Sequence, residues 1–236
     1  TSFSFIARAE TIVLAGATPV YVDINPRTFN IDIEKIEAAI TSKTKAIMPV
    51  HYRGLPCNMD IILQLAKDNK ITVIEDAAHA LGSSYHGKKI GSFGDMTCFS
   101  FDPIKTITCG EGGAVVTRDK KMYESIIRKR ILGIDKDTWS RYKNERSWSY
   151  DVIEQGYRYH MSNINAAIGL VQIKKFEQMN KRKIDIAKRY DEEFAPIEGL
   201  SLLRIEYENL GLFTYIIKVK ERRDELMVHL KEKGIG

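Results

Sequence analysis

Residues 71–105 contain two short apolar runs, and each run ends in polar residues that a ligand could use. Ile71–Ile74 (I-T-V-I) is followed by Glu75 and Asp76, and Met96–Phe101 (M-T-C-F-S-F) is followed by a turn that leads to Lys105. Short runs rich in β-branched and aromatic residues are typical of buried strands. Ligands of open α/β sheets bind outside the carboxyl ends of the strands. We therefore expect Asp76, Ser100 and Lys105 to face one crevice.

The rest of the chain alternates between strand-like and helix-like patterns, which predicts an α/β fold. Further strands are expected at 18–23, 46–50 and 114–117, and helices at 33–40, 60–69 and 121–132. Asp32 is positioned to cap the first of these helices. Such alternation is typical of βαβ units and favours a mostly parallel central sheet with flanking helices. Residues 134–148 lack clean periodicity, so we expect an excursion outside the core.

The C-terminal part predicts a long helix and a second, smaller unit. Residues 163–194 are mostly helical in pattern, and the basic run Lys181–Lys183 is expected on the solvated face of that helix. Strands are expected at 200–203 and 213–219, followed by a helix at 221–233 that Gly234 ends. We expect a large domain over residues 1–170, and a bridging helix with the start of a small α+β domain over residues 171–236.

The composition is that of a globular protein and excludes several classes. The 236 residues are 44% hydrophobic and 28% charged, and no run reaches the roughly 18 apolar residues that span a bilayer. The net charge of +5 favours anionic ligands but is too scattered to indicate nucleic acid binding. Three cysteines without a C-x-x-C pair favour a reducing cytoplasm. The five histidines lack metal-ligand spacing, so no metal site is expected.

An aspartate, a hydroxyl and a lysine at one crevice suggest one chemistry in particular. A lysine can form a Schiff base with an aldehyde, a carboxylate can keep a pyridine nitrogen protonated, and a hydroxyl can hold a phosphate. Pyridoxal phosphate (PLP) enzymes need this set of groups. The spacing alone leaves alternatives open, because Asp76 could be a turn or cap residue and Lys105 could be solvated.

The amino-acid sequence of this segment resembles that of the DegT/DnrJ-type sugar aminotransferases, a PLP-dependent family of fold type I. The resemblance is carried by E-D-A-A-H-A-L-G-S-S-Y-H-G-K-K-I-G-S-F-G-D, by F-S-F-D-P-I-K-T-I-T-C-G-E-G-G, and by flanking motifs such as G-Y-R-Y-H-M-S-N-I-N-A-A-I-G. It covers nearly the whole chain in order. Relatives usually extend further at both ends, so the chain is expected to be an internal fragment that lacks an N-terminal part of the large domain.

The resemblance implies a role for each residue at the crevice. Lys105 would bind PLP, or face its amino form PMP, and shuttle a proton, while Asp76 would pair with the pyridine nitrogen. His79 would lie against the cofactor face, although a packed core histidine is a serious alternative. Ser100 would bind the phosphate, unless it is a strand serine satisfied by the backbone. Asp102 stands where many relatives carry histidine, a departure with no evident consequence.

The same resemblance implies a homodimer with shared active sites. His160 and Asn163 would lie on a loop that reaches the phosphate in the other subunit. The position of His160 more often holds arginine or asparagine, and Asn163 could be a plain helix cap.

The function implied is transfer of an amino group from glutamate or glutamine to a nucleotide-linked keto-sugar, in the biosynthesis of surface polysaccharide, such as O-antigen, or of glycoconjugates. Lys105 favours this reaction over a related dehydratase branch in which histidine replaces the lysine. The alternative is a non-catalytic dimeric protein that keeps the fold for binding or regulation. The intact Asp76, Ser100 and Lys105 argue against that alternative.

Overall fold

The core of the molecule is a four-stranded sheet with β2 near its centre. The computed structural model describes residues 1, 3–135, 150–203 and 205–235. The strand order is β1 (Ala46–Ile47), β2 (Thr72–Asp76), β5 (Met96–Ser100) and β6 (Gly113–Thr117). The β1–β2 and β2–β5 pairs are parallel and β5–β6 is antiparallel. The sheet is therefore mostly parallel, as the alternation of elements predicts, and β2 and β5 end at the same edge.

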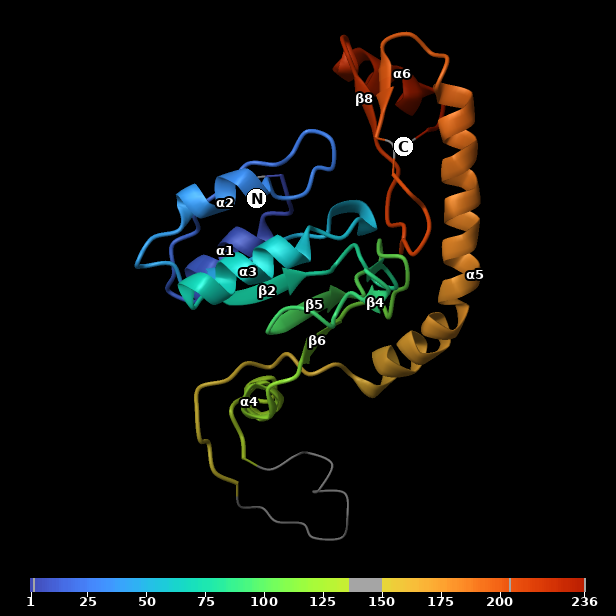
Figure 1. The fold of residues 1–236 in the computed structure, drawn as a ribbon. Coiled ribbons are helices and arrows are strands. Elements are labelled where there is room, and N and C mark those ends of the chain that lie inside the picture. Colours follow the sequence, from blue (N-terminus) through green and yellow to red (C-terminus); the bar gives the residue numbers. More distant parts are fainter. Residues whose placement is uncertain (2, 136–149, 204, 236) are drawn as a thin grey trace.

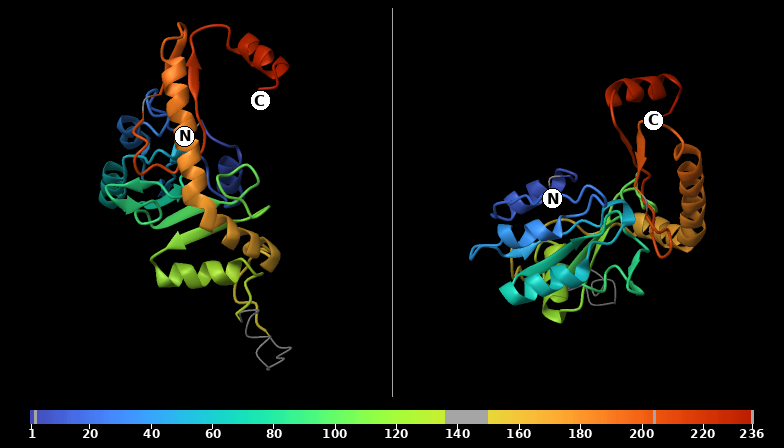
Figure 2. Two further views of the ribbon diagram at one scale, coloured as in Figure 1. Left: turned by 90° about the vertical axis from the view of Figure 1, so that its right-hand side faces the viewer. Right: turned by 45° about the horizontal axis from the view of Figure 1, so that its top comes forward.

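Helices α2 (Ile33–Ala39) and α3 (Met59–Asn69) form the packed layer beside β1 and β2. Both begin where a side chain caps them, because the Asp32 carboxylate accepts the Glu34 N–H and the side-chain Oδ1 of Asn58 accepts the Ile61 N–H. Their apolar faces bury a cluster against the sheet that includes Ile36, Met59, Ile62 and Val73. Helix α1 (Ala7–Leu14) lies on the other side of the molecule from α2 and α3 (Figure 2, left), and α4 (Lys120–Lys129) follows β6 (Figure 1).

The C-terminal part begins with helix α5 (Asn163–Phe194), which runs along one side of the molecule (Figures 1 and 2). Strands β7 (Leu200–Leu202) and β8 (Ile217–Val219) pair antiparallel, and α6 (Arg223–Glu232) follows them. Between β7 and β8, Leu210 and Leu212 pack against Ala187 of α5. The expected boundary at residue 170 falls within the continuous helix α5, and the division into two domains stays a prediction.

Two strand predictions are wrong, for reasons visible in the backbone. Residues 18–23 form no strand; Val20 and Tyr21 are 70% and 57% exposed, and only an isolated bridge joins Ile24 to Ile31. The segment 213–219 is a strand only over Ile217–Val219. The preceding backbone instead bonds to irregular segments, since the Phe213 N–H donates to the carbonyl of Arg53 (3.0 Å).

Other elements differ at their ends or were not expected. The helix expected at 121–132 ends at Lys129, and Leu132 adopts a positive φ of 60°. Helix α1, the 3-10 turn η1 (Tyr52–Gly54) and the hairpin of β3 (Ser84–Tyr85) and β4 (Lys88–Lys89) were not predicted. Most of the excursion expected at 134–148 lies outside the described residues.

Candidate active site

Asp76 is held at the carboxyl end of β2 by both its backbone and its side chain. Its N–H donates to the Pro49 carbonyl (2.9 Å) and its carbonyl accepts the His51 N–H (3.1 Å). Its Oδ1 accepts the Ala78 N–H (3.0 Å), and Nη1 of Arg8 lies 2.8 Å from its Oδ2. The carboxylate is only 19% exposed. Asp76 is thus a fixed anion at the edge where β2 and β5 end.

Lys105 reaches this edge from the turn that follows β5. The turn is closed by the Lys105 N–H, which donates to the Asp102 carbonyl, and by the Ile104 N–H, which donates to the Asp102 carboxylate, both at 3.0 Å. Burial lowers the pKa of the Lys105 amine, although the carboxylates of Asp102 and Asp76 oppose the shift. The departure at Asp102 therefore has a structural consequence: this residue orders the lysine turn and favours the protonated amine.

His79 lies between aromatic rings and close to the charges of the same site. Its ring stacks on Phe213 (centroids 4.1 Å apart, planes at 15°) and lies 5.5 Å from the ring of Tyr52. Burial lowers the pKa of His79 to about 4, and the ammonium of Lys105 adds to this shift. Its Nδ1 is buried and has no hydrogen-bond partner within the described structure. His79 is therefore a neutral ring with one unused polar atom.

Phe213 connects His79 with the two lysines of the site. The Nζ of Lys105 lies 4.7 Å from the centroid of the Phe213 ring, and that of Lys183 lies 5.8 Å from it. Ammonium groups over an aromatic face are attracted by its quadrupole. The carboxyl end of β2 points toward the segment that carries Phe213 (Figure 1). The charges of Asp76 and Lys105 both act on His79, and that of Asp76 acts on Lys105, so these three residues belong to one cluster.

Ser100 is the last residue of β5, half-buried at the same edge of the sheet. Its Oγ accepts the Asp102 N–H at 3.4 Å. This contact with the backbone is the alternative role expected for Ser100. It uses only an acceptor site of the hydroxyl, so the O–H can still donate a hydrogen bond. The geometry is compatible with phosphate binding, and that role stays a prediction.

His160 precedes helix α5, Asn163 is the first residue of that helix, and both are exposed. In the described part of the chain, neither forms a hydrogen bond or ion pair with Asp76, His79, Ser100 or Lys105. The alternative of Asn163 as a helix cap is wrong, because the Ser162 hydroxyl caps α5 by accepting the Asn165 N–H (3.1 Å). Their role toward a second subunit stays a prediction.

Three residues of the cluster were missed from the sequence: Arg8, Phe213 and Lys183. The run Lys181–Lys183 was expected to be solvated, but only part of it is. Lys183 is half-buried, its Nζ donates to the Thr106 hydroxyl (3.2 Å), and burial lowers its pKa. Its spacing of four residues from the buried Ala187 is the signal that could have placed it on the inner face of the helix.

A buried polar network lies directly behind Asp76. The His51 Nδ1 accepts the Cys57 N–H (3.0 Å), so the neutral ring carries its proton on Nε2, which donates to Glu75 (2.8 Å). Glu75 also accepts the Thr97 hydroxyl and the Gly94 N–H, each at 2.7 Å. Burial alone would raise the pKa of Glu75, but these hydrogen bonds and the nearby ring lower it overall. The network fixes β2 one residue before Asp76.

Comparisons with known proteins identify the relatives of the chain. The family model described as the DegT/DnrJ/EryC1/StrS aminotransferase family matches residues 1–236. The chain is 48% identical to the uncharacterized protein MJ1066 of Methanocaldococcus jannaschii over 100% of this chain and 63% of that protein. It is 40% identical to the spore coat polysaccharide biosynthesis protein SpsC of Bacillus subtilis over 98% of this chain and 61% of that protein.

A solved structure confirms the predicted fold class. Spr1654 of Streptococcus pneumoniae, named as a candidate sugar aminotransferase, superimposes in its PMP form with a TM-score of 0.90 and 32% identity, over 99% of this chain and 65% of that one. The same protein is also solved in a PLP form. The chain thus spans less than two thirds of the length of the relatives it matches. No helix in the described residues is long and apolar enough to cross a membrane.

Proposed function

The chain belongs to the DegT/DnrJ/EryC1/StrS aminotransferase family, and we propose from this premise that it carries the active site of a PLP-dependent sugar aminotransferase. The observation that carries the proposal is the cluster of Asp76, His79 and the partly buried Lys105 at the carboxyl edge of the sheet. Spr1654, solved with PLP and with PMP, supports the same cofactor for this chain.

The residues present fit this cofactor. Asp76 offers a carboxylate for a pyridine nitrogen, and the buried Nδ1 of His79, which has no hydrogen-bond partner among the described residues, offers a further polar atom beside it. Ser100 offers a hydroxyl for a phosphate. Lys105 offers an amine whose lowered pKa leaves more of it unprotonated, and only the unprotonated amine can act as a nucleophile or accept a proton. When bound, PLP carries the amino group between donor and acceptor while its ring withdraws electrons.

Each residue contributes a separate physical step. The amine of Lys105, which is partly removed from solvent, takes up and returns a proton at the reacting carbon. Asp76, fixed by the Ala78 N–H, holds a positive partner in one orientation. One face of the neutral His79 ring is stacked on Phe213, so its other face is the one proposed to orient an aromatic ligand. Ser100 donates a hydrogen bond to an oxyanion.

The acceptor proposed is a nucleotide-linked keto-sugar and the donor is glutamate or glutamine. The net charge of +5 and the half-buried amine of Lys183 support an anionic substrate. The name of SpsC, a spore coat polysaccharide biosynthesis protein, supports a pathway to surface polysaccharide, such as O-antigen, or to glycoconjugates. The free thiols of Cys57, Cys98 and Cys109 support a reducing, cytoplasmic location.

The proposed assembly is a homodimer that completes each site with His160 and Asn163 of the other subunit. Large apolar side chains exposed on α1 and on the first half of α5 support it, among them Leu14 (79%), Ile164 (75%) and Leu170 (66%). Light scattering of the full-length protein would measure the mass expected for two copies.

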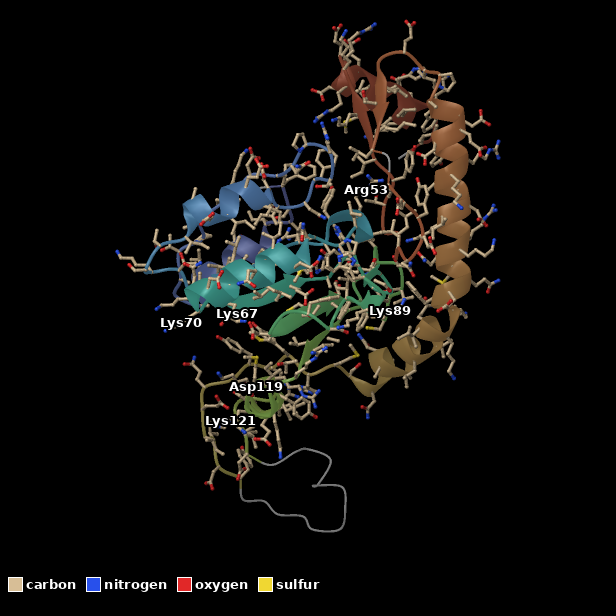
Figure 3. The ribbon with its side chains drawn as sticks, viewed as in Figure 1. Arg53, Lys67, Lys70, Lys89, Asp119 and Lys121 are labelled. Atoms are coloured by element: carbon tan, nitrogen blue, oxygen red, sulfur yellow. The ribbon has the colours of Figure 1, made fainter. Side chains whose placement is uncertain are left out.

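One experiment tests the proposed reaction on the full-length gene product. Added PLP should produce a visible absorption band, and added glutamate should then produce 2-oxoglutarate. In Lys105→Ala the absorption band should be lost. The turnover rate should fall by about 10²–10⁴-fold, which is the contribution of a positioned proton-transfer group. Lys67→Ala is the matched control, because Lys67 is exposed and lies at the end of α3 remote from Arg53 and the C-terminal segment (Figure 3).

The outcomes separate the proposed enzyme from its alternative. A protein that binds PLP through Lys105 but forms no 2-oxo acid from either glutamate or glutamine, even with keto-sugar nucleotides present, would be a binding protein that keeps the fold. A variant Lys105→Ala with unchanged turnover would contradict the assignment of this lysine.

A further inference from the structure

Arg8 forms an ion pair with Asp76, the carboxylate that the proposed cofactor would use. It is the second residue of α1, and its Nη1 lies 2.8 Å from Oδ2 of Asp76, with the two side chains only 17% and 19% exposed. The other oxygen, Oδ1, accepts the Ala78 N–H (3.0 Å). Both oxygens of the carboxylate are therefore engaged by the chain itself.

The contact between Arg8 and Asp76 is an attraction of charges rather than an aligned hydrogen bond. Both Nε and Nη1 of Arg8 are buried and lack a hydrogen-bond partner among the residues that the structure describes. Strong arginine–carboxylate pairs are bidentate, with N–H groups directed at the oxygens. This pair lacks that alignment, so a better-directed donor can compete for the carboxylate.

The charge of Arg8 also acts on the other residues of the cluster. Burial is the main cause of the lowered pKa of Lys105 and of His79, and Arg8 lowers both further. The guanidinium thus faces the interior of the candidate site rather than solvent.

We propose that Arg8 is a positioning residue of the cofactor site, which competes with the PLP ring nitrogen for the carboxylate of Asp76. The inference rests on the proposed function. A protonated ring nitrogen carries a single N–H donor that suits one carboxylate oxygen. With Arg8 present, the Asp76 carboxylate interacts with both the guanidinium and the protonated ring nitrogen. The cofactor therefore binds less tightly than it would if Asp76 had no other partner. In the absence of the cofactor, Arg8 keeps the buried carboxylate compensated.

The test is a PLP titration of the full-length protein, followed by absorption. Arg8→Gln and Arg8→Met, which keep the aliphatic stem, should lower the Kd for PLP about fivefold, the change that a modest ion pair produces. Arg8→Lys keeps the charge and should change the Kd less. In an Asp76→Asn background the Arg8→Gln effect should vanish, because the contested carboxylate is gone. Arg27→Gln, at an exposed arginine, is the matched control.

The outcomes distinguish this inference from the proposed function. An unchanged or higher Kd in both Arg8→Gln and Arg8→Met overturns the competition, while the function stands. Wild-type protein that binds no PLP overturns the function, and the competition with it. A second measurement needs no cofactor: a double-mutant cycle between Arg8→Gln and Asp76→Asn in urea unfolding should show coupling, and zero coupling overturns the pairing.

Discussion

His79 shows how the surroundings of a single side chain decide its charge. Its ring stacks on Phe213, and burial together with the ammonium of Lys105 lowers its pKa from 6.5 to about 4. The histidine therefore stays uncharged at neutral pH and presents a flat apolar face. The sequence places His79 three residues after Asp76 but contains no signal for its partner, which lies more than a hundred residues away.

The first prediction follows from this pKa. Because the unfolded histidine binds a proton below about pH 6.5 and the folded one only below about pH 4, the unfolded state carries more protons between these values. The free energy of unfolding should therefore fall as the pH drops through this window, by on the order of 1–2 kcal/mol, since water still reaches part of the ring. Urea unfolding at both ends of the window measures it.

The variant His79→Phe keeps the stack and removes the titration, so it should lose this part of the pH dependence. His229→Gln, at an exposed histidine of α6, should retain the wild-type dependence. A His79→Phe protein with the full wild-type dependence would show that other groups cause it.

Strand β2 is the element on which the candidate site is built. Its pattern of β-branched residues predicts the strand, and the parallel pairing with β5 brings the ends of both strands to one edge. What fixes the end of β2 is the pair of His51 and Glu75, which are both fully buried. Their contact joins positions 24 residues apart and depends on the β1–β2 pairing, so no local sequence pattern predicts it.

The second prediction concerns this buried pair. His51→Ala or Glu75→Ala leaves the other polar group buried without its partner and should reduce the free energy of unfolding by about 3–5 kcal/mol. The double variant should cost less than the sum of the two, because neither group is then left unpaired. Chemical unfolding of the four proteins measures the coupling.

The exposed pair of His86 and Asp60 provides the contrast. Its atoms lie 3.2 Å apart, but the side chains are 70% and 67% exposed, so His86→Ala should cost less than about 1 kcal/mol. Equal losses at His51 and His86 would contradict the role of burial.

At the scale of the whole molecule, the C-terminal part is joined to the sheet at a contact between two glycines. Gly54 (φ +97°) faces Gly211 so closely that a Cβ on Gly54 would overlap the Gly211 carbonyl oxygen. The Ser83 hydroxyl completes the contact, since it donates to the Gly54 carbonyl (2.6 Å) and accepts the Gly211 N–H (2.8 Å). This contact fixes the segment that places Phe213 over His79 and Lys105.

The third prediction tests this contact. Gly54→Ala should cost more than about 3 kcal/mol or prevent folding, because backbone strain and overlap add. Gly87→Ala is the matched control, since Gly87 also has a positive φ (+74°) but nothing lies within 4 Å of the added Cβ. That variant should cost only about 1 kcal/mol in thermal or urea unfolding. Similar losses in the two variants would show that strain alone matters at Gly54.

Sequence patterns alone predict most helices and strands of this protein and the types of side chain at its candidate site. Short-range periodicity specifies helices α2 and α3 and the strands β2 and β5, and Asp32 marks the start of α2. The motif from Glu75 to Lys105 specifies an acid and a lysine near one edge. Only the tertiary structure decided the partners: Arg8 beside Asp76, Phe213 over His79, and Lys183 turned inward. These pairs join residues far apart in the chain, and their energies depend on burial and distance, which a local pattern does not contain.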